Sequence, residues 1–246
     1  MRAMIFAAGL GTRLRPLTDL RPKALVEIDH RPMLEHLILK LKREGFREIV
    51  INIHHKGEMI LDFLKSHDDF GLDILVSDER QQLLDTGGGI LKARDFLKGA
   101  PFLVHNVDIV SDIPLQDLAR QHSSSGALAT LAVSSRKTSR YLLFDKGLSM
   151  RGWQNIQTGE VLPLGTDLEQ AHLTPLAFQG IHILEPDVLD LMGEGTPWTG
   201  KFSIIPFYTD ICQSHEIKAF QTGAYKWFDI GKVETLLTAQ EWMQGR

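Results

Sequence analysis

Short apolar segments alternate with segments of helical periodicity through the first half of the chain. Residues 49–53, I-V-I-N-I, are apolar and β-branched, which is typical of a strand buried on both faces of a parallel sheet. Residues 33–44 place apolar side chains at helical spacing and end at Gly45, where a helix terminus is expected. Further strands are predicted at residues 3–8, 72–77 and 102–105, and helices at residues 56–66, 89–97 and 115–122. This order predicts an α/β fold of three layers, with a mostly parallel central sheet between helices.

The second half of the chain follows a different pattern. Residues 128–134 and 141–145 alternate as antiparallel or mixed strands do, and residues 178–184 form another apolar run. The central sheet is therefore expected to be mixed. No Pro/Ser-rich linker or internal repeat divides the chain, so residues 1–246 are predicted to form a single domain.

Composition narrows the class of protein. Hydrophobic residues make up 43% of 246 residues, as in globular proteins, and the net charge of −4 argues against a nucleic-acid partner. The single cysteine, Cys212, excludes an internal disulfide and fits a reducing compartment. No apolar run is long enough to span a membrane, and no leader-like start is evident. We expect a cytoplasmic protein without a membrane partner, either a monomer or a dimer.

A glycine-rich turn follows the first predicted strand, in A-A-G-L-G-T-R-L-R-P-L-T-D-L-R-P-K-A-L. Gly9 and Gly11 let the backbone approach an anion closely. The turn matches neither G-x-G-x-x-G, whose third glycine would fall at Leu14, nor the Walker pattern. It carries its own cations instead, at Arg13, Arg15 and Lys23, and Pro16 prevents a helix from growing out of it. We interpret this stretch as a loop that wraps a polyphosphate; the alternative is a surface loop with solvated arginines.

Two aspartates are candidate metal ligands. Asp108 follows the predicted strand at residues 102–105, and ligands of open α/β sheets bind beyond the carboxyl ends of strands. Asp229 lies in the apolar run W-F-D-I-G, where a buried acid needs a partner. Mg²⁺ prefers such hard oxygens and bridges substrate phosphates. A turn cap for Asp108 and a helix cap for Asp229 remain the alternatives.

The run L-D-T-G-G-G-I places three glycines before the helix predicted at residues 89–97. A flat glycine backbone with free N–H and C=O groups suits the edge of a nucleobase. The alternative is a flexible loop.

These motifs, in this order, resemble the sugar-1-phosphate nucleotidyltransferases: G-L-G-T-R with a later P-K, then T-G-G-G, N-V-D and W-F-D-I-G-K. The resemblance covers nearly the whole chain. It implies a Rossmann-like sheet and the transfer of a nucleoside monophosphate from a nucleoside triphosphate to a sugar 1-phosphate, with release of pyrophosphate. Residues 1–125 would be the nucleotide-binding half, and residues 126–246 would bind the sugar and supply the second metal ligand.

The resemblance also implies roles for single residues. Arg13 would bind the triphosphate and stabilise the leaving pyrophosphate, and Lys23 would hold the sugar phosphate and the α-phosphate. Asp108 and Asp229 match the two metal-binding aspartates, which implies Mg²⁺, or Mn²⁺ in its place. The residues implied to line the nucleotide are Ala8, Gly9, Gly11, Thr12, Thr86 and Gly87.

The chain departs from the family pattern in two places. Val107 stands where the family usually has glycine before the first aspartate, and the frequent Glu-Lys pair that contacts the sugar is not evident. By elimination, the second half should hold the sugar, with Trp153, Asn155 and Gly180 as candidates, although Trp153 could equally be a core residue.

The substrate remains open among several candidates. The short form looks most like the uridylyltransferases of N-acetylmuramate 1-phosphate, which points to cell-wall precursor synthesis from UTP. The alternatives are GTP with mannose or heptose 1-phosphate, and CTP with phosphocholine. A non-catalytic nucleotide-sugar-binding module is the alternative of a different class, and retention of both cations and both aspartates argues against it.

Overall fold

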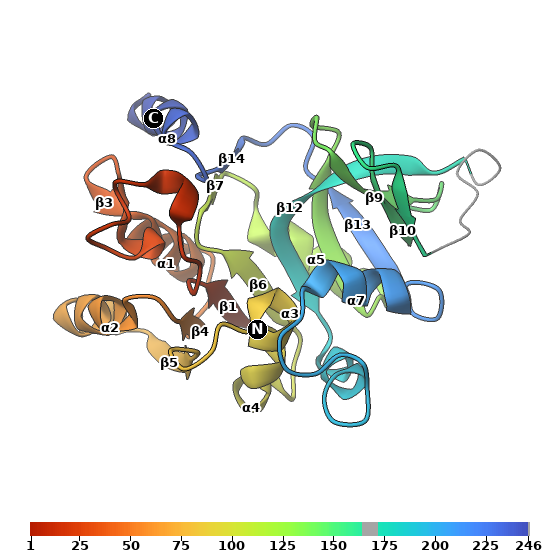
Figure 1. The fold of residues 1–246 in the computed structure, drawn as a ribbon, viewed down its shortest axis with the longest axis horizontal. Coiled ribbons are helices and arrows are strands. Elements are labelled where there is room, and N and C mark those ends of the chain that lie inside the picture. The colour runs from red at the N-terminus through yellow and green to blue at the C-terminus, as the bar shows by residue number, and fades with distance from the viewer. Residues whose placement is uncertain (164–171, 246) are drawn as a thin grey trace.

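The structure is a computed structural model that describes residues 1–163 and 172–245. Its main feature is a mixed sheet with the strand order β11-β10-β9-β12-β6-β1-β4-β5, in which β8 also pairs with β12 and with β13 (Figure 1). The strands of this sheet are β1 (Arg2–Phe6), β4 (Glu48–Ile53), β5 (Asp73–Asp78), β6 (Phe102–Asn106), β8 (Ala129–Ser134), β9 (Arg140–Phe144), β10 (Met150–Asn155), β11 (Glu160–Leu162), β12 (Thr174–Leu184) and β13 (Ile217–Gln221).

Four neighbouring strands form the parallel part of the sheet. β1 lies between β4 and β6, so Ile5 pairs with Ile51 on one side and with His105 on the other. β5 continues the parallel order beyond β4, and β12 joins β6 in the antiparallel sense. The predicted mixed, mostly parallel sheet is confirmed. Because all four parallel strands run the same way, their carboxyl ends share one edge, which is where ligands of open α/β sheets bind.

Helices cover both faces of the sheet. The side chains of α1, α2 and α5 pack with Ile5 in one hydrophobic core, and those of α3, α4 and α7 pack with Met4 in a second core on the opposite face. The predicted three-layer arrangement is therefore present. The helices are α1 (Met33–Arg43), α2 (Gly57–Ser66), α3 (Asp85–Lys92), α4 (Arg94–Leu97), α5 (Leu115–Ser125), α7 (Ile204–Ile211) and α8 (Val233–Gln244).

The C-terminal segment returns to the first loop of the chain. Strand β14 (Trp227–Asp229) pairs antiparallel with β7 (Ile109–Ser111), directly after the predicted position of the first metal aspartate. A third hydrophobic core joins Leu14 to Ile230 and to Leu236 of α8. Figure 1 shows α8 beside β3 (Arg31–Pro32), which pairs with β2 (Glu27–Ile28).

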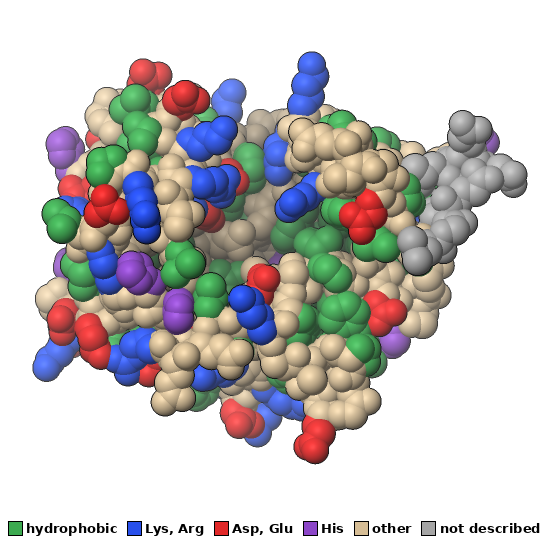
Figure 2. Space-filling view, in the orientation of Figure 1, with side chains coloured by type: hydrophobic (Ala, Val, Ile, Leu, Met, Phe, Trp, Pro, Cys, Tyr) green, Lys and Arg blue, Asp and Glu red, His purple; other side chains and the backbone are tan. Residues whose placement is uncertain are grey.

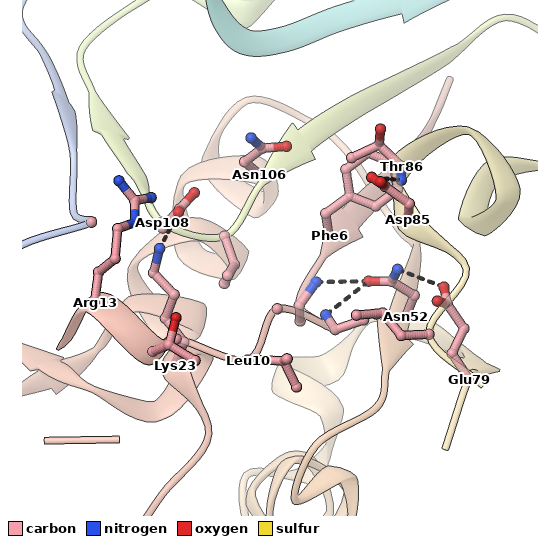
Figure 3. Close-up of a pocket in the computed structure, with 18 of the residues that line it drawn as sticks. Phe6, Leu10, Arg13, Lys23, Asn52, Glu79, Asp85, Thr86, Asn106 and Asp108 are labelled. Atoms are coloured by element: carbon pink, nitrogen blue, oxygen red, sulfur yellow. Dashed lines mark hydrogen bonds and ion pairs between the residues drawn. The ribbon is translucent and has the colours of Figure 1, made fainter. Parts of the chain in front are cut away.

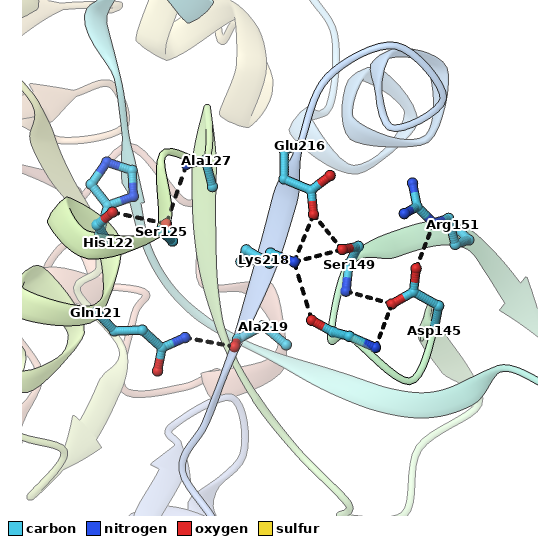
Figure 4. A network of polar contacts seen from close by, with 11 residues as sticks. Gln121, His122, Ser125, Ala127, Asp145, Ser149, Arg151, Glu216, Lys218 and Ala219 are labelled. Atoms are coloured by element: carbon cyan, nitrogen blue, oxygen red, sulfur yellow. Dashed lines mark hydrogen bonds and ion pairs between the residues drawn. The ribbon is translucent and has the colours of Figure 1, made fainter.

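A polar network fastens the β9–β10 hairpin to β13 (Figure 4). Lys218 Nζ lies 2.8 Å from Glu216 Oε1 and donates to Ser149 Oγ at 2.7 Å, and Ser149 Oγ also contacts Glu216. Within the hairpin, Arg151 Nε donates to Asp145 Oδ2 at 2.8 Å. These bonds hold the β9–β10 turn against β13, within the second half of the chain.

The sequence patterns did not predict α7 or the strands β2, β3, β7, β10, β11, β13 and β14. The elements that they did predict agree in position, except that the helix expected at residues 89–97 begins at Asp85 and is divided into α3 and α4. In the part of the chain that the structure describes, no helix has both the length and the apolar character that crossing a bilayer requires.

Candidate active site

A cavity of about 440 Å³ opens at the carboxyl ends of β1, β4 and β6 (Figure 3). The first loop supplies much of its wall, and the start of α3 supplies its far end. Figure 2 shows a hollow near the centre of this face of the molecule, with Lys and Arg side chains around it. Its lining includes Phe6, Ala8, Gly9, Gly11, Thr12, Arg13, Lys23, Asn52, Glu79, Leu83, Asp85, Thr86, Asn106, Val107, Asp108, Lys201 and Gly231.

Gly9 and Gly11 of the first loop are in different structural environments. No atom would lie within 4 Å of a Cβ on Gly9, so its backbone stays open to the cavity. Gly11 has a φ of +66°, and a Cβ there would lie 2.8 Å from Thr18 Cγ2 and 3.0 Å from Lys23 Cβ. Thr18 Oγ1 also donates to the Gly11 carbonyl at 2.9 Å. Gly11 is therefore required for the turn that brings Lys23 to the cavity.

Lys23 forms an ion pair with Asp108, which lies two residues beyond β6. Both side chains are mostly buried, with 10% of Lys23 and 19% of Asp108 exposed. Water screens such a pair little, so each charge holds the other in place. The structure thus brings together the predicted loop cation and the predicted strand-end carboxylate, 85 residues apart in sequence.

Arg13 lines the cavity, whereas Asp229 lies beside it, near enough for the charges of Asp108, Lys23 and Arg13 to act on its carboxyl group. Arg13 is in a short 3₁₀ turn, Thr12–Leu14, and its guanidinium packs on Gly231, where a Cβ would lie 2.9 Å from Nη2. Asp229 is in β14 opposite Ile109, and the next residue, Ile230, donates its N–H to the Asp108 carbonyl at 2.8 Å. The β7–β14 pairing therefore fixes the two aspartates beside each other.

The Asp229 carboxyl is held in an unfavourable environment. Burial raises its pKa above the ordinary value, and the neighbouring Asp108 carboxylate raises it further. Lys23 and Arg13 act in the opposite direction. Asp229 Oδ1 is buried and has no hydrogen-bond partner among the described residues. An unpartnered carboxylate oxygen beside a second carboxylate is an arrangement that a bound cation would stabilise.

The donor set fits Mg²⁺. In residues 1–163 and 172–245, no group of three His, Cys, Asp or Glu residues gathers as a metal site. Asp108 and Asp229 supply two carboxylates, and Mg²⁺ commonly takes one or two carboxylates and completes its shell with water and substrate phosphates. These two residues would therefore hold the ion together with a bound triphosphate.

A buried polar clamp, which sequence reasoning missed, joins the two arms of the cavity (Figure 3). Asn52 Oδ1 accepts the N–H groups of Ala7 and Ala8 at 2.7 and 3.2 Å. Asn52 Nδ2 donates to Glu79 Oε1 at 2.7 Å, and Glu79 Oε2 accepts the N–H of Leu84 at 3.0 Å. The one signal in the sequence is that Asn52 is the single polar residue of I-V-I-N-I. Because Ala8 gives its N–H to Asn52, it cannot offer that group to a nucleotide.

The three glycines do not form a flat segment before a helix, so that expectation is wrong. Helix α3 begins at Asp85, and Gly87 and Gly88 both donate their N–H groups to the Phe202 carbonyl, at 2.9 and 3.1 Å. A Cβ on Gly87 would lie 2.2 Å from the Phe202 ring. These glycines allow close packing against the segment before α7. Thr86 lines the cavity, whereas Gly87 lies behind it with its N–H already bonded.

The second half of the chain also contributes to the first cavity, which corrects the expectation that residues 1–125 alone build the predicted triphosphate site. Lys201 and Gly231 both line it. Arg15, by contrast, is exposed and lies 3.4 Å from Asp19, away from the cavity lining. Val107 is 4% exposed and packs in the first hydrophobic core, so its methyl groups are accommodated at the strand end.

A second cavity, of about 420 Å³, lies over the β9–β10–β11 sheet and includes Trp153. Strand register places Trp153 between Leu142 and Leu162, and places Asn155 in the next row on the same face, between Arg140 and Glu160. The residues that line the second cavity are Arg136, Thr138, Arg140, Leu142, Trp153, Glu160, Leu162, Phe178, Ser203, Ile205, Pro206 and Thr209.

The remaining predicted sugar residues lie elsewhere. Gly180 has a φ of +71°, and a Cβ there would lie 2.7 Å from Asn106 Nδ2 at the edge of the first cavity. Asn155 Oδ1 accepts the N–H of Gln157, so part of its side chain caps the β10–β11 turn. His182, near Gly180, is a core residue that stacks on Phe178. Part of the segment expected to hold the sugar, residues 164–171, lies outside the described residues.

Known proteins match both the sequence and the fold. The family described as Nucleotidyl transferase matches residues 2–245. The N-acetylmuramate alpha-1-phosphate uridylyltransferase of Caulobacter vibrioides is 29% identical over 97% of this chain and 95% of its own length. A protein of Oryza sativa subsp. japonica named probable mannose-1-phosphate guanylyltransferase 2 is 42% identical over 54% of this chain, and the match spans 38% of that relative.

The fold comparison agrees. A putative glucose-1-phosphate thymidylyltransferase from Bacillus anthracis superposes with a TM-score of 0.81 at 18% identity, covering 100% of this chain and 96% of the other. At that identity the likeness establishes the Rossmann-like α/β fold alone. The family match covers nearly the whole chain and confirms the interpretation of the ordered motifs: this protein belongs to the nucleotidyl transferase family, with relatives named as sugar-1-phosphate nucleotidyltransferases.

Proposed function

We propose that this protein transfers a nucleoside monophosphate from a nucleoside triphosphate to a sugar 1-phosphate and releases pyrophosphate. The observation that carries the proposal is that Arg13, Lys23 and Asp108 line one end of the first cavity, with Asp229 beside them and within reach of their charges. Two cations and a metal-binding carboxylate pair suit a reaction between two polyanions. A module that only bound nucleotide-sugar would not need a buried carboxylate oxygen left without a partner.

The chemistry needs no general base. The nucleophile is an oxygen of the sugar phosphate, whose second pKa of about 6 leaves it largely ionised at pH 7. This oxygen forms a bond to the α-phosphorus while the bond from that phosphorus to the pyrophosphate oxygen breaks. The difficulty lies in bringing negative charges together, so the absence of a histidine–carboxylate or serine–histidine pair from the cavity lining is consistent with the mechanism.

Each residue has a role in this scheme. Lys23 lies at the strand end beside Asp108 and would hold the reacting phosphates against each other. Arg13 would bind the β- and γ-phosphates and stabilise the charge that builds up on the leaving pyrophosphate. Mg²⁺ held by Asp108 and Asp229 would neutralise phosphate oxygens and orient them.

Our preferred substrates are UTP and N-acetylmuramate 1-phosphate. The Caulobacter vibrioides uridylyltransferase supports this choice because it matches over 97% of this chain and 95% of its own length. Guanylyl transfer to mannose 1-phosphate is the second candidate, supported by the 42% identity to the rice protein over 138 residues. The apolar floor around Trp153, with polar groups in the next row, suits a sugar ring that carries an acylated substituent.

The test is pyrophosphate release measured over four nucleoside triphosphates and a panel of sugar 1-phosphates, with phosphocholine included. We expect turnover with UTP and N-acetylmuramate 1-phosphate to exceed every other pair by at least tenfold. Turnover only with GTP and mannose 1-phosphate would establish the second candidate. Tight nucleotide-sugar binding without turnover for any pair would contradict catalysis and favour the binding module.

A further inference from the structure

The nucleotide cavity has two arms that come from different parts of the chain. One arm is the first loop, which leaves β1 at Ala7 and Ala8; the other is the start of α3, with Asp85 and Thr86 (Figure 3). Arg13, Lys23 and Asp108 lie at the end of the cavity opposite Asp85 and Thr86 (Figure 3). A nucleoside triphosphate with its phosphates at the cations therefore extends its nucleoside toward α3, so its affinity depends on the separation of the two arms.

The clamp residues Asn52 and Glu79 connect these arms directly. Asn52 is 3% exposed and Glu79 is fully buried. Asn52 accepts hydrogen bonds from the N–H groups of Ala7 and Ala8, where the first loop begins. Glu79 accepts a hydrogen bond from the N–H of Leu84, just before α3. The bond between Asn52 Nδ2 and Glu79 Oε1, at 2.7 Å, closes the link. Each of these hydrogen bonds replaces bonds to water that the buried groups have lost. Removing one partner therefore leaves a buried polar group without a hydrogen bond, which destabilises the folded protein.

Gly89 of α3 gives independent evidence that the clamp is built into the fold. A Cβ on Gly89 would lie 2.9 Å from Glu79 Oε1 and 3.2 Å from Asn52 Nδ2. Glycine inside a helix costs about 1 kcal/mol relative to alanine, so its presence needs a reason. The reason here is that the clamp fills the space that a methyl group would take. The third glycine of T-G-G-G therefore serves the clamp rather than the ligand.

We propose that Asn52 and Glu79 are positioning residues that set the separation of the two nucleotide-binding arms, and that Gly89 is glycine to admit them. They act through the backbone of Ala8 and Leu84 rather than through the reacting phosphates. The inference rests on the proposed function, because it concerns how the same cavity holds a nucleoside triphosphate. It predicts that damage to the clamp weakens nucleotide binding and leaves sugar 1-phosphate binding almost unchanged.

The experiment measures the affinity for Mg²⁺–UTP by direct titration, the KM for sugar 1-phosphate and the thermal unfolding temperature. The variants Asn52→Asp and Glu79→Gln each break one link, and Gly89→Ala pushes on both side chains. We expect each to weaken nucleotide binding about tenfold or more, as loss of outer supporting bonds commonly does. The double variant Asn52→Asp with Glu79→Gln exchanges donor and acceptor and restores every bond of the clamp. It should recover nucleotide affinity to within about threefold of the wild type.

Leu189→Ala is the matched control, because Leu189 is a buried core residue outside both cavity linings and its truncation costs stability. If the clamp variants lose no more nucleotide affinity than Leu189→Ala, or lose affinity for both substrates equally, the inference is wrong. Failure of the double variant to recover would also contradict it. If the wild type binds no nucleoside triphosphate at all, the proposed function fails and the inference fails with it. If the wild type binds the nucleotide and the clamp variants bind it equally well, the inference is wrong and the proposed function still stands.

Discussion

Arg13 and Gly231 lie against each other although 218 positions separate them: a Cβ on Gly231 would lie 2.9 Å from Arg13 Nη2 and 3.0 Å from its Cζ. The φ of Gly231 is not in the left-handed region, so alanine fits the backbone there. Because the clash falls on the far end of a flexible side chain, Gly231→Ala should displace the guanidinium and cost little stability. We expect turnover to fall about tenfold with an unchanged unfolding temperature. Gly223→Ala, at a glycine with open space around it, is the control, and equal activity of both variants would contradict the contact.

Removal of Arg13 itself should be more severe. Arg13→Ala is expected to lower turnover by about two to four orders of magnitude, because it removes charge stabilisation focused on the transition state. Arg15→Ala should matter far less, since Arg15 is exposed and pairs with Asp19 outside the cavity lining. Steady-state rates at saturating substrate concentrations, compared between the wild type and the two variants, test this prediction. Near-normal turnover of the Arg13 variant would remove the role assigned to it.

The aspartate pair predicts a metal requirement. Activity should depend on Mg²⁺ or Mn²⁺ and be lost with a chelator, and Asp108→Asn or Asp229→Asn should raise the metal concentration needed for half-maximal rate. Without metal, Asp229→Asn should be slightly more stable than the wild type, because a neutral amide relieves the repulsion from Asp108. Metal titrations and urea unfolding test the two effects. An Asp229 variant with full activity at low metal would show that the aspartate is only structural.

The second cavity predicts a selective effect on the sugar. Asn155 adjoins the second cavity without lining it: it lies between Arg140 and Glu160, one row from Trp153 on the same face of the strands. Asn155→Ala should raise the KM for sugar 1-phosphate several-fold and leave the KM for the nucleotide almost unchanged, because Asn155 adjoins the second cavity and does not line the first. Gln157→Ala, at the exposed neighbour in the same turn, controls for loosening of the hairpin. A selective loss of nucleotide binding would mean that the two halves are assigned the wrong way round.

Buried histidines predict acid sensitivity. Burial lowers the pKa of His182 to about 3, and both of its ring nitrogens lack hydrogen-bond partners among the described residues. Since the pKa in the unfolded chain is about 6.5, the unfolded state binds the proton first and stability falls as the pH drops below about 6.5. Between pH 7 and 5 this residue should cost about 2 kcal/mol of unfolding free energy.

His182→Leu should remove the contribution of His182 to the pH dependence of stability. Urea unfolding at pH 7 and at pH 5 measures this contribution. His55→Gln, at an exposed histidine, should leave the dependence as it is in the wild type. His105 contributes in the same direction, because burial also lowers its pKa to about 3. The prediction is therefore a smaller slope for His182→Leu rather than a flat profile. An unchanged slope would show that His182 already titrates normally in the folded protein.

Local sequence patterns were sufficient to predict the layers of the fold and the residue types of the candidate site. Short apolar β-branched runs favour buried strands, and the amphipathic segments between them are expected to cover the sheet, so the three layers could be predicted from local pattern. The glycine turn with Arg13 and Lys23, and the aspartates that follow strands, were likewise visible because each has a local signature.

Which side chains come into contact depends on the packing of segments that are distant in sequence. The pairing of β7 with β14 sets Asp229 beside Asp108, and the packing of α3 against Phe202 turns a predicted flat loop into helix. The clamp between Asn52 and Glu79 joins neighbouring strands of the sheet, and its role depends on which backbone groups each side chain reaches. Local sequence encodes the propensity of each segment for helix, strand or turn. Contacts such as these depend instead on how segments distant in sequence pack and bury their surfaces against each other, which no short stretch of sequence specifies.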